Sequence, residues 1–199
     1  MFRLPLLFAR PYPYERKVAE RVADFQGKMR GLAEKMRSGD LSYKDWVYRS
    51  RLAISGHVLD GAVLGAARSQ GVAPSKVKMT VGDRRGMLQA TTEQWRYFNK
   101  FAATVTAAKA AGTELTSAVD ARAELYGGAI RGAYNSVYLA ASAEQLPLRW
   151  VRHAMDSCAT CIANEGRVAT PAEWEGGGVW PAHGTLCDGR CRCELVRST

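Results

Sequence analysis

Apolar residues recur at alternating steps of four and three positions early in the chain, and this spacing predicts an amphipathic helix from about Glu15 to Ser38. Basic and acidic side chains cover its other faces, and its apolar seam consists of Val18, Val22, Phe25, Met29, Leu32 and Met36. Ser38-Gly39-Asp40 supplies the stop signal. Ahead of the helix, three prolines exclude regular helix, so residues 1–14 are expected to form an extended amino-terminal arm that docks on another surface.

A second helix is predicted to begin near Ser42, which can cap the helix amino end with Asp45 three residues on. Its expected apolar positions are Trp46, Val47, Ile54, Val58 and Leu59. The following stretch, residues 61–67, is rich in glycine and alanine and would let another helix approach closely. Gly71 and Pro74 indicate the end of this helix.

Residues 72–86 are predicted to form a connector, after which two more helices follow. The third has an apolar face of Leu88, Trp95, Phe98, Ala102 and Val105, and Gly112 breaks it. The fourth is expected from about Thr116 to Ala143, with an apolar face of Val119, Leu125, Tyr126, Ile130, Tyr134, Val137 and Tyr138. Gly127-Gly128 weakens this helix relative to alanine, which indicates tight packing or a kink there.

After Pro147 the pattern changes to tryptophans, a Gly-Gly-Gly run and cysteines, which indicates short strands and turns rather than helix. The sequence therefore predicts a mainly α fold in three parts. These are the arm over residues 1–14, a helical bundle over residues 15–146, and a small cysteine- and histidine-containing metal-binding knuckle, treble-clef-like, over residues 147–199.

The charge balance is strongly basic, with 28 Lys and Arg against 19 Asp and Glu, a net charge of +9. Such a surplus favours contact with polyanions, although a solvated basic surface has the same composition. No stretch reaches the roughly 18 to 20 consecutive apolar residues of a membrane-spanning helix, so no membrane contact is expected. The 47% hydrophobic share is typical of a globular protein.

All five cysteines lie in the last fifth of the chain, at positions 158, 161, 187, 191 and 193. A secreted disulfide scaffold usually spreads an even number through the fold, so this crowding indicates a reducing compartment and a metal site. The preferred ligands of a structural zinc ion are Cys158, Cys161, His183 and Cys191. Cys187 competes with His183 for the third place, and Cys193 is a further candidate. Disulfides in the mature protein remain an alternative.

Catalytic use of the same segment is not expected, and the chain is predicted not to be an enzyme. Glu165 and Glu173 are near the cysteines in sequence, but Cys158 lacks the preceding His-x-Glu pattern of zinc deaminases. A redox function of the Cys-x-x-Cys pair lacks the expected strand and helix around it. His57 lies in an apolar helical context typical of a core histidine. His153 is expected at the surface, with a supporting position beside the metal as the alternative.

Several short motifs occur in one order along the second half of the chain. They are Arg122-Ala-Glu-Leu-Tyr126, Ala133-Tyr-Asn135, Trp150, Asp156-Ser-Cys-Ala-Thr-Cys161, Gly166-Arg-Val168, Pro181-Ala-His183 and Cys191-Arg-Cys193. This succession, over roughly residues 115–196, resembles the Mu F-like minor head, or head-morphogenesis, proteins of tailed bacteriophages. The family spaces its His and its Cys-Arg-Cys by two residues. Here residues 184–190 intervene and add Cys187, which makes Cys187 the alternative to His183.

The resemblance implies a structural virion protein inside the capsid near the portal vertex, made in the host cytoplasm, that acts in head assembly, DNA packaging or DNA delivery. Its implied partners are the portal protein, the major capsid protein or both, with contact to packaged DNA and multiple copies in a symmetric assembly. The alternative function is a zinc-dependent nucleic-acid-binding module in the host cytoplasm. A thiol oxidoreductase is the third and least expected class.

Overall fold

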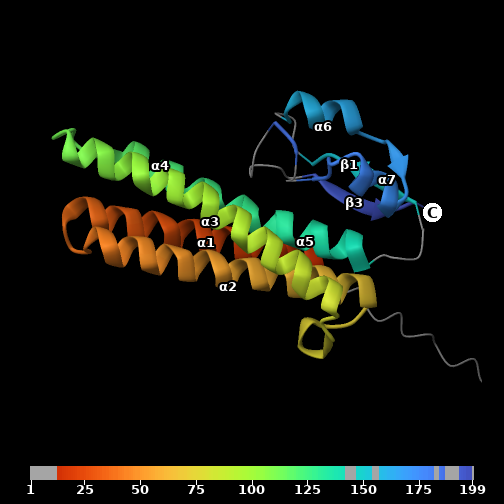
Figure 1. The fold of residues 1–199 in the computed structure, drawn as a ribbon. Coiled ribbons are helices and arrows are strands. Elements are labelled where there is room, and N and C mark those ends of the chain that lie inside the picture. The colour runs from red at the N-terminus through yellow and green to blue at the C-terminus, as the bar shows by residue number, and fades with distance from the viewer. Residues whose placement is uncertain (1–12, 142–146, 154–156, 182–183, 187–192, 199) are drawn as a thin grey trace, which may run out of the picture.

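A computed structural model describes residues 13–141, 147–153, 157–181, 184–186 and 193–198. Figure 1 shows long helices lying side by side, with a small sheet and two short helices at one end of the bundle. We call residues 13–141 the helical body and the described residues from 147 onward the carboxy-terminal module. The predicted mainly α fold is confirmed.

The first two helices begin and end close to where the sequence predicts. Helix α1 spans Tyr14–Ser38 and buries most of its predicted seam, and Gly39 ends it in the left-handed conformation (φ 90°). Helix α2 spans Tyr43–Gln70, and the Ser42 hydroxyl accepts a hydrogen bond from the Asp45 amide as predicted. Leu59 is the exception, since 44% of its surface is exposed although the sequence placed it on the apolar face.

The connector is shorter than predicted because helix α3 begins at Val81 and runs to Ala110. Thr80 and Asp83 form a capping box that offsets the two glycines in the first turns of α3, and the sequence reading missed it. A single 3-10 turn, η1 (Pro74–Lys76), lies within the remaining connector. Phe98, Ala102 and Val105 are buried as expected, but Leu88 and Trp95 are 62% and 40% exposed, so their assignment to the buried face is wrong.

The predicted fourth helix is divided at the Gly127-Gly128 pair. Helix α4 (Ser117–Glu124) passes through the 3-10 turn η2 (Leu125–Gly127) into helix α5 (Gly128–Ala141). The glycine also permits close packing, since a Cβ on Gly127 would lie 2.6 Å from the Gln26 side chain. The sequence predicted tight packing or a kink at the glycine pair, and the close contact of Gly127 with Gln26 confirms the tight packing.

Helix α5 lies directly against α2, and the small residues of α2 make this possible. A Cβ on Gly61 would lie 2.3 Å from the Ile130 carbonyl oxygen, and one on Gly65 would lie 2.3 Å from that of Tyr134. These are backbone atoms that no side-chain rotation can move. The close helix approach predicted for residues 61–67 is therefore confirmed.

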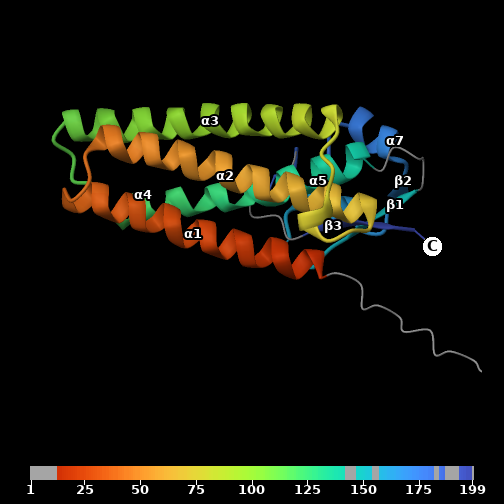
Figure 2. The same cartoon turned by 90° about the horizontal axis from the view of Figure 1, so that it is seen from below.

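A cluster of aromatic rings lies in the bundle core near the amino end of α2. Trp46 contacts Phe98 and Phe101 edge-on at centroid distances of 5.3 and 5.8 Å, and Phe98 also contacts Tyr126 at 5.6 Å. Seen from below, α1 and α3 lie on opposite sides of α2 (Figure 2). None of the described helices is long and apolar enough to cross a membrane.

The carboxy-terminal module contains three short strands in the order β2-β1-β3, all antiparallel. The strands are β1 (Leu148–Val151), β2 (Val168–Ala169) and β3 (Glu194–Arg197). Two six-residue helices, α6 (Ala159–Asn164) and α7 (Pro171–Gly176), connect them, so the prediction of strands and turns without helix is only partly right. The module sits on the second half of α5, where the Asn135 amide donates to the Pro181 carbonyl (3.1 Å) and the Trp180 indole donates to the Ser136 hydroxyl (3.0 Å).

The predicted arm of residues 1–14 falls almost wholly outside the described residues. Tyr14 belongs to α1 rather than to an arm. Its hydroxyl donates to the carbonyl oxygens of Ala67 (3.2 Å) and Val72 (2.9 Å), which ties the start of α1 to the end of α2.

Candidate metal centre

Cys158 and Cys161 bracket the first turn of α6 and lie together as the Cys-x-x-Cys spacing predicts. Cys158 is the residue that precedes the helix, and Cys161 is buried within it. Their sulfur atoms are 3.5 Å apart, with the Cys158 thiol directed at the Cys161 sulfur. The turn therefore presents two sulfurs to one point in space.

This separation has a chemical meaning. Two thiolates on one tetrahedral zinc ion, each bonded at about 2.3 Å, lie roughly 3.8 Å apart. A disulfide needs about 2.05 Å instead. The sulfur pair fits two ligands of a shared cation, and the thiolate donors are of the kind that zinc prefers.

Of the other predicted ligands, only Cys193 lies within the described residues. His183, Cys187 and Cys191 lie outside the described residues. Cys193 is described, and it is buried immediately before β3. Within the described ranges no three His, Cys, Asp or Glu side chains lie close enough together to hold a metal ion.

The module surrounds this sulfur pair with an apolar cluster that is continuous with the helical body. Cys161 and Cys193 pack with Trp150, Trp174 and Leu195, and the end of α5 contributes further apolar residues, Tyr138 and Leu139. The Trp174 indole donates to the Leu148 carbonyl (3.2 Å), which fixes α7 on β1. The backbone of Trp150 pairs with Gly166 and Arg167, each at 2.9 Å, and so holds the turn after α6 on the sheet.

The carboxylates considered as catalytic bases make local structural contacts instead. Glu165 accepts a hydrogen bond from the Arg152 guanidinium (2.9 Å). Glu173 accepts from the Thr170 amide (2.7 Å) within the capping box of α7. The hydrogen bonds from the Thr170 amide and the Thr170 hydroxyl hold the pKa of Glu173 below its ordinary value. Glu173 therefore acts as a helix cap.

The two remaining histidines are also placed by the structure. His57 is buried, its Nδ1 lies 2.9 Å from the Ala53 carbonyl, and its ring packs on Phe25 at 4.6 Å, which confirms the core assignment. His153 is half exposed, and its Nε2 lies 2.7 Å from Glu194 Oε1. It belongs to an ionic cluster that the sequence reading did not identify.

This ionic cluster joins the helical body to the module and consists of Glu15, Arg68, Arg131, Tyr134, His153 and Glu194. Glu15 accepts hydrogen bonds from Arg68 (2.8 Å), Arg131 (3.2 Å) and the Tyr134 hydroxyl (2.6 Å). Arg68 also reaches Glu194 of β3 at 3.5 Å, and its guanidinium lies over the Tyr138 ring at 4.4 Å. Four elements, α1, α2, α5 and β3, meet at these side chains.

The two carboxyl groups of the cluster differ in their proton affinity. Burial, with the adjacent Glu15 charge, raises the pKa of Glu194. Burial also disfavours ionised Glu15, but hydrogen bonds from Glu194 and Tyr134 and the charges of the two arginines outweigh it, and they hold the pKa of Glu15 below its ordinary value. Burial raises the pKa of Tyr134, which keeps its hydroxyl a donor to Glu15. Glu15 is thus the ionised partner of Arg68 and Arg131.

A signal for this cluster exists in the sequence. Arg68 and Arg131 are single charges within the most apolar, small-residue stretches of their helices, where a buried charge requires a partner. Their partners Glu15 and Glu194 are 53 and 126 residues from Arg68, so the pairing itself becomes visible only in the fold.

Comparisons of the chain with protein-family models, with characterised proteins and with solved structures found no match.

Proposed function

We propose that the carboxy-terminal module is held together by one structural zinc ion, bound by Cys158, Cys161 and two further ligands from His183, Cys187 and Cys191. The observation that carries this proposal is the 3.5 Å separation of the two sulfurs at the start of α6. A module with three short strands and two six-residue helices buries little surface of its own, and in such small units a metal ion commonly supplies the missing stabilisation.

For the whole chain we propose a structural role as a minor head protein of a tailed bacteriophage, inside the capsid near the portal vertex. The ordered motifs of its second half support this role, and the long helices provide extended surfaces for assembly. Portal or major capsid protein would be the partner, and the +9 net charge suits a protein that lies beside packaged DNA.

Three of the five tryptophans, although not the exposed Trp95, favour this structural role over the alternative nucleic-acid-binding module. Base stacking requires accessible rings. Trp46, Trp150 and Trp174 are almost completely buried, and their rings belong to the cores of the body and the module. Several arginines are also neutralised within the chain, as in the pairs Arg37–Asp120 (3.0 Å) and Arg152–Glu165 (2.9 Å).

Metal analysis of the purified full chain tests the zinc proposal. We expect about one zinc per chain, and its loss in Cys158→Ser and Cys161→Ser. Ala159→Ser is the matched control, because it adds a hydroxyl at an exposed position between the two cysteines without removing a thiol. A wild-type chain without stoichiometric metal, whose stability Cys158→Ser leaves unchanged, would disprove the zinc site.

Co-expression with portal and major capsid proteins tests the structural role. We expect the chain to sediment with assembled heads and to show no zinc-dependent affinity for free duplex DNA. Tight binding to free DNA that requires zinc, with no incorporation into heads, would instead establish the nucleic-acid-binding alternative.

A further inference from the structure

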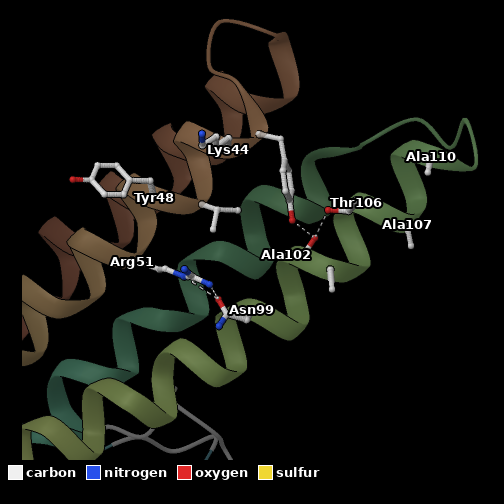
Figure 3. Close-up of a pocket in the computed structure, with 11 residues that line it drawn as sticks. Lys44, Tyr48, Arg51, Asn99, Ala102, Thr106, Ala107 and Ala110 are labelled. Atoms are coloured by element: carbon white, nitrogen blue, oxygen red, sulfur yellow. Dashed lines mark hydrogen bonds between the residues drawn. The ribbon is translucent and has the colours of Figure 1, made fainter.

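A shallow apolar groove of about 720 Å³ runs between α2 and α3 on the helical body. Its floor along α3 is made of alanines at near-helical spacing, among them Ala103, Ala107 and Ala110. All three are exposed. Figure 3 shows that a hydrogen-bonded pair crosses it, in which the Arg51 guanidinium donates to the Asn99 side-chain oxygen at 3.0 and 2.7 Å.

The groove continues past this pair along α3. A second hollow, lined by residues of α3 alone, shares Asn99 and Ala103 with the first and extends to Thr92. From Thr92 to Ala110 the floor spans about 27 Å at 1.5 Å per residue. Together the two hollows are therefore about as long as a helix of 18 residues, which is longer than a small molecule.

The charged side chains that line the groove, among the described residues, are all cationic. Of the described residues that line the two hollows, four are cationic and none is acidic; the cations are Lys44, Arg51, Arg96 and Lys100. Two of them come from α2 and two from α3. Exposed aromatic rings accompany them, since Tyr48 is 62% and Trp95 is 40% exposed.

We propose that this groove is the docking site for an amphipathic, acidic helix of a partner protein. Small apolar side chains of the partner would lie on the alanine floor. Asp and Glu on the flanks of its apolar stripe would pair with the cations on either side. The site is on the helical body and makes no use of the cysteines, so it does not depend on the zinc proposal.

Charge also argues against the other occupants. A second copy packed symmetrically through this groove would place the same four cations against their equivalents. Residues 1–12 carry Arg3 and Arg10 and no acidic residue, so this segment lacks the complementary charge. Duplex DNA offers phosphates to the cations but nothing to an alanine floor, which would stay in contact with water.

Binding of a synthetic peptide to the full-length chain tests the proposal. The probe has about 18 residues, with leucines at helical spacing on one face and glutamates flanking them, and fluorescence anisotropy reports its binding. We expect saturable binding that Ala107→Glu weakens at least about tenfold. Ala107→Leu fills the floor without adding charge and should also weaken binding. Thr104→Glu adds the same charge at an exposed position of α3 outside the groove and should change the affinity less than about twofold.

Each outcome either supports or overturns the proposal. Loss of binding in both Ala107 variants, with Thr104→Glu near wild type, supports the groove. Equal weakening by Ala107→Glu and Thr104→Glu would show that attraction to the basic surface alone binds the peptide, and would overturn the proposal. Equal binding of a peptide with lysines in place of the glutamates would also overturn the proposal. So would binding of duplex DNA that the Ala107 variants weaken. Circular dichroism confirms that each variant is folded.

Discussion

The helical body and the carboxy-terminal module are held together in different ways. The body has long helices, an aromatic cluster around Trp46, and close contact of Gly61 and Gly65 of α2 with the backbone of α5. In the module the longest described helix has six residues and the longest strand has four. Its apolar cluster relies on two residues of α5, Tyr138 and Leu139. A cooperative core thus stabilises the body, while the module depends on its attachment and on the proposed metal.

Removal of the metal should give the largest difference between the body and the module. With a chelator of high zinc affinity, we expect backbone amides at Trp150 and Gly166 to lose at least about a hundredfold in hydrogen-exchange protection. Amides of α2 around Ile54 should keep theirs, because the body contains no cysteine. Hydrogen exchange with mass spectrometry measures both regions in one experiment. Unchanged protection in the module would contradict a metal-dependent fold.

A second large effect is expected where the helices of the body are packed most closely. Gly65→Ala would place a Cβ 2.3 Å from the Tyr134 carbonyl oxygen and force α2 and α5 apart, so we expect a loss of about 3 kcal/mol or more in the free energy of unfolding. Urea denaturation measures it. Gly56→Ala in the same helix is the control, since it has open space around it and should be stabilising by about 0.5–1 kcal/mol. Similar values for both would show that the close helix approach is wrong.

The same difference explains what the sequence could predict. The seam of α1, the Ser42 cap and the close approach at residues 61–67 follow from local spacing, and all three are confirmed. Local spacing cannot tell which apolar positions meet a partner within the chain. Leu59, Leu88 and Trp95 fit the helical period, yet each keeps 40% or more of its surface exposed.

The candidate site was predictable to a smaller extent. The Cys158–Cys161 pair follows from a spacing of three residues, which one turn fixes whatever the rest of the chain does. The ionic cluster could not be assigned in the same way, because Glu15, Arg68 and Glu194 come from three distant segments that meet only after the helices have packed.

The junction between body and module should show an intermediate effect. Glu15→Gln removes the charge that Arg68 and Arg131 share, and we expect a loss of about 2 kcal/mol at neutral pH. Because the folded-state pKa of Glu15 lies below its ordinary value of 4.5, ionised Glu15 stabilises the fold above that value. This contribution is lost as the pH falls through the lowered folded-state value.

Thermal denaturation of wild type and Glu15→Gln from pH 7 to pH 3 checks this expectation, and the difference between them should shrink as the pH decreases. Glu20→Gln is the control, because Glu20 pairs with Lys17 on the solvent-exposed side of the same helix and its loss should leave stability unchanged. A pH-independent difference would mean that Glu15 acts through packing rather than through its charge.

The smallest effects are expected at two matched capping boxes, one in each region. Thr80 with Asp83 begins the 30-residue α3, and Thr170 with Glu173 begins the six-residue α7. Thr→Ala at either position removes one capping hydrogen bond and should cost about 1 kcal/mol of stability, whereas Thr→Ser keeps the hydroxyl and should cost only a few tenths.

The two Thr→Ala variants should be detected by different measurements. Thr80→Ala should lower the urea midpoint of the whole body, because α3 is part of its cooperative core. Thr170→Ala should leave that midpoint unchanged and reduce hydrogen-exchange protection around Trp174 alone. If Thr170→Ala lowered the midpoint of the body as well, the two regions would unfold as one unit, and the metal would then stabilise the entire chain.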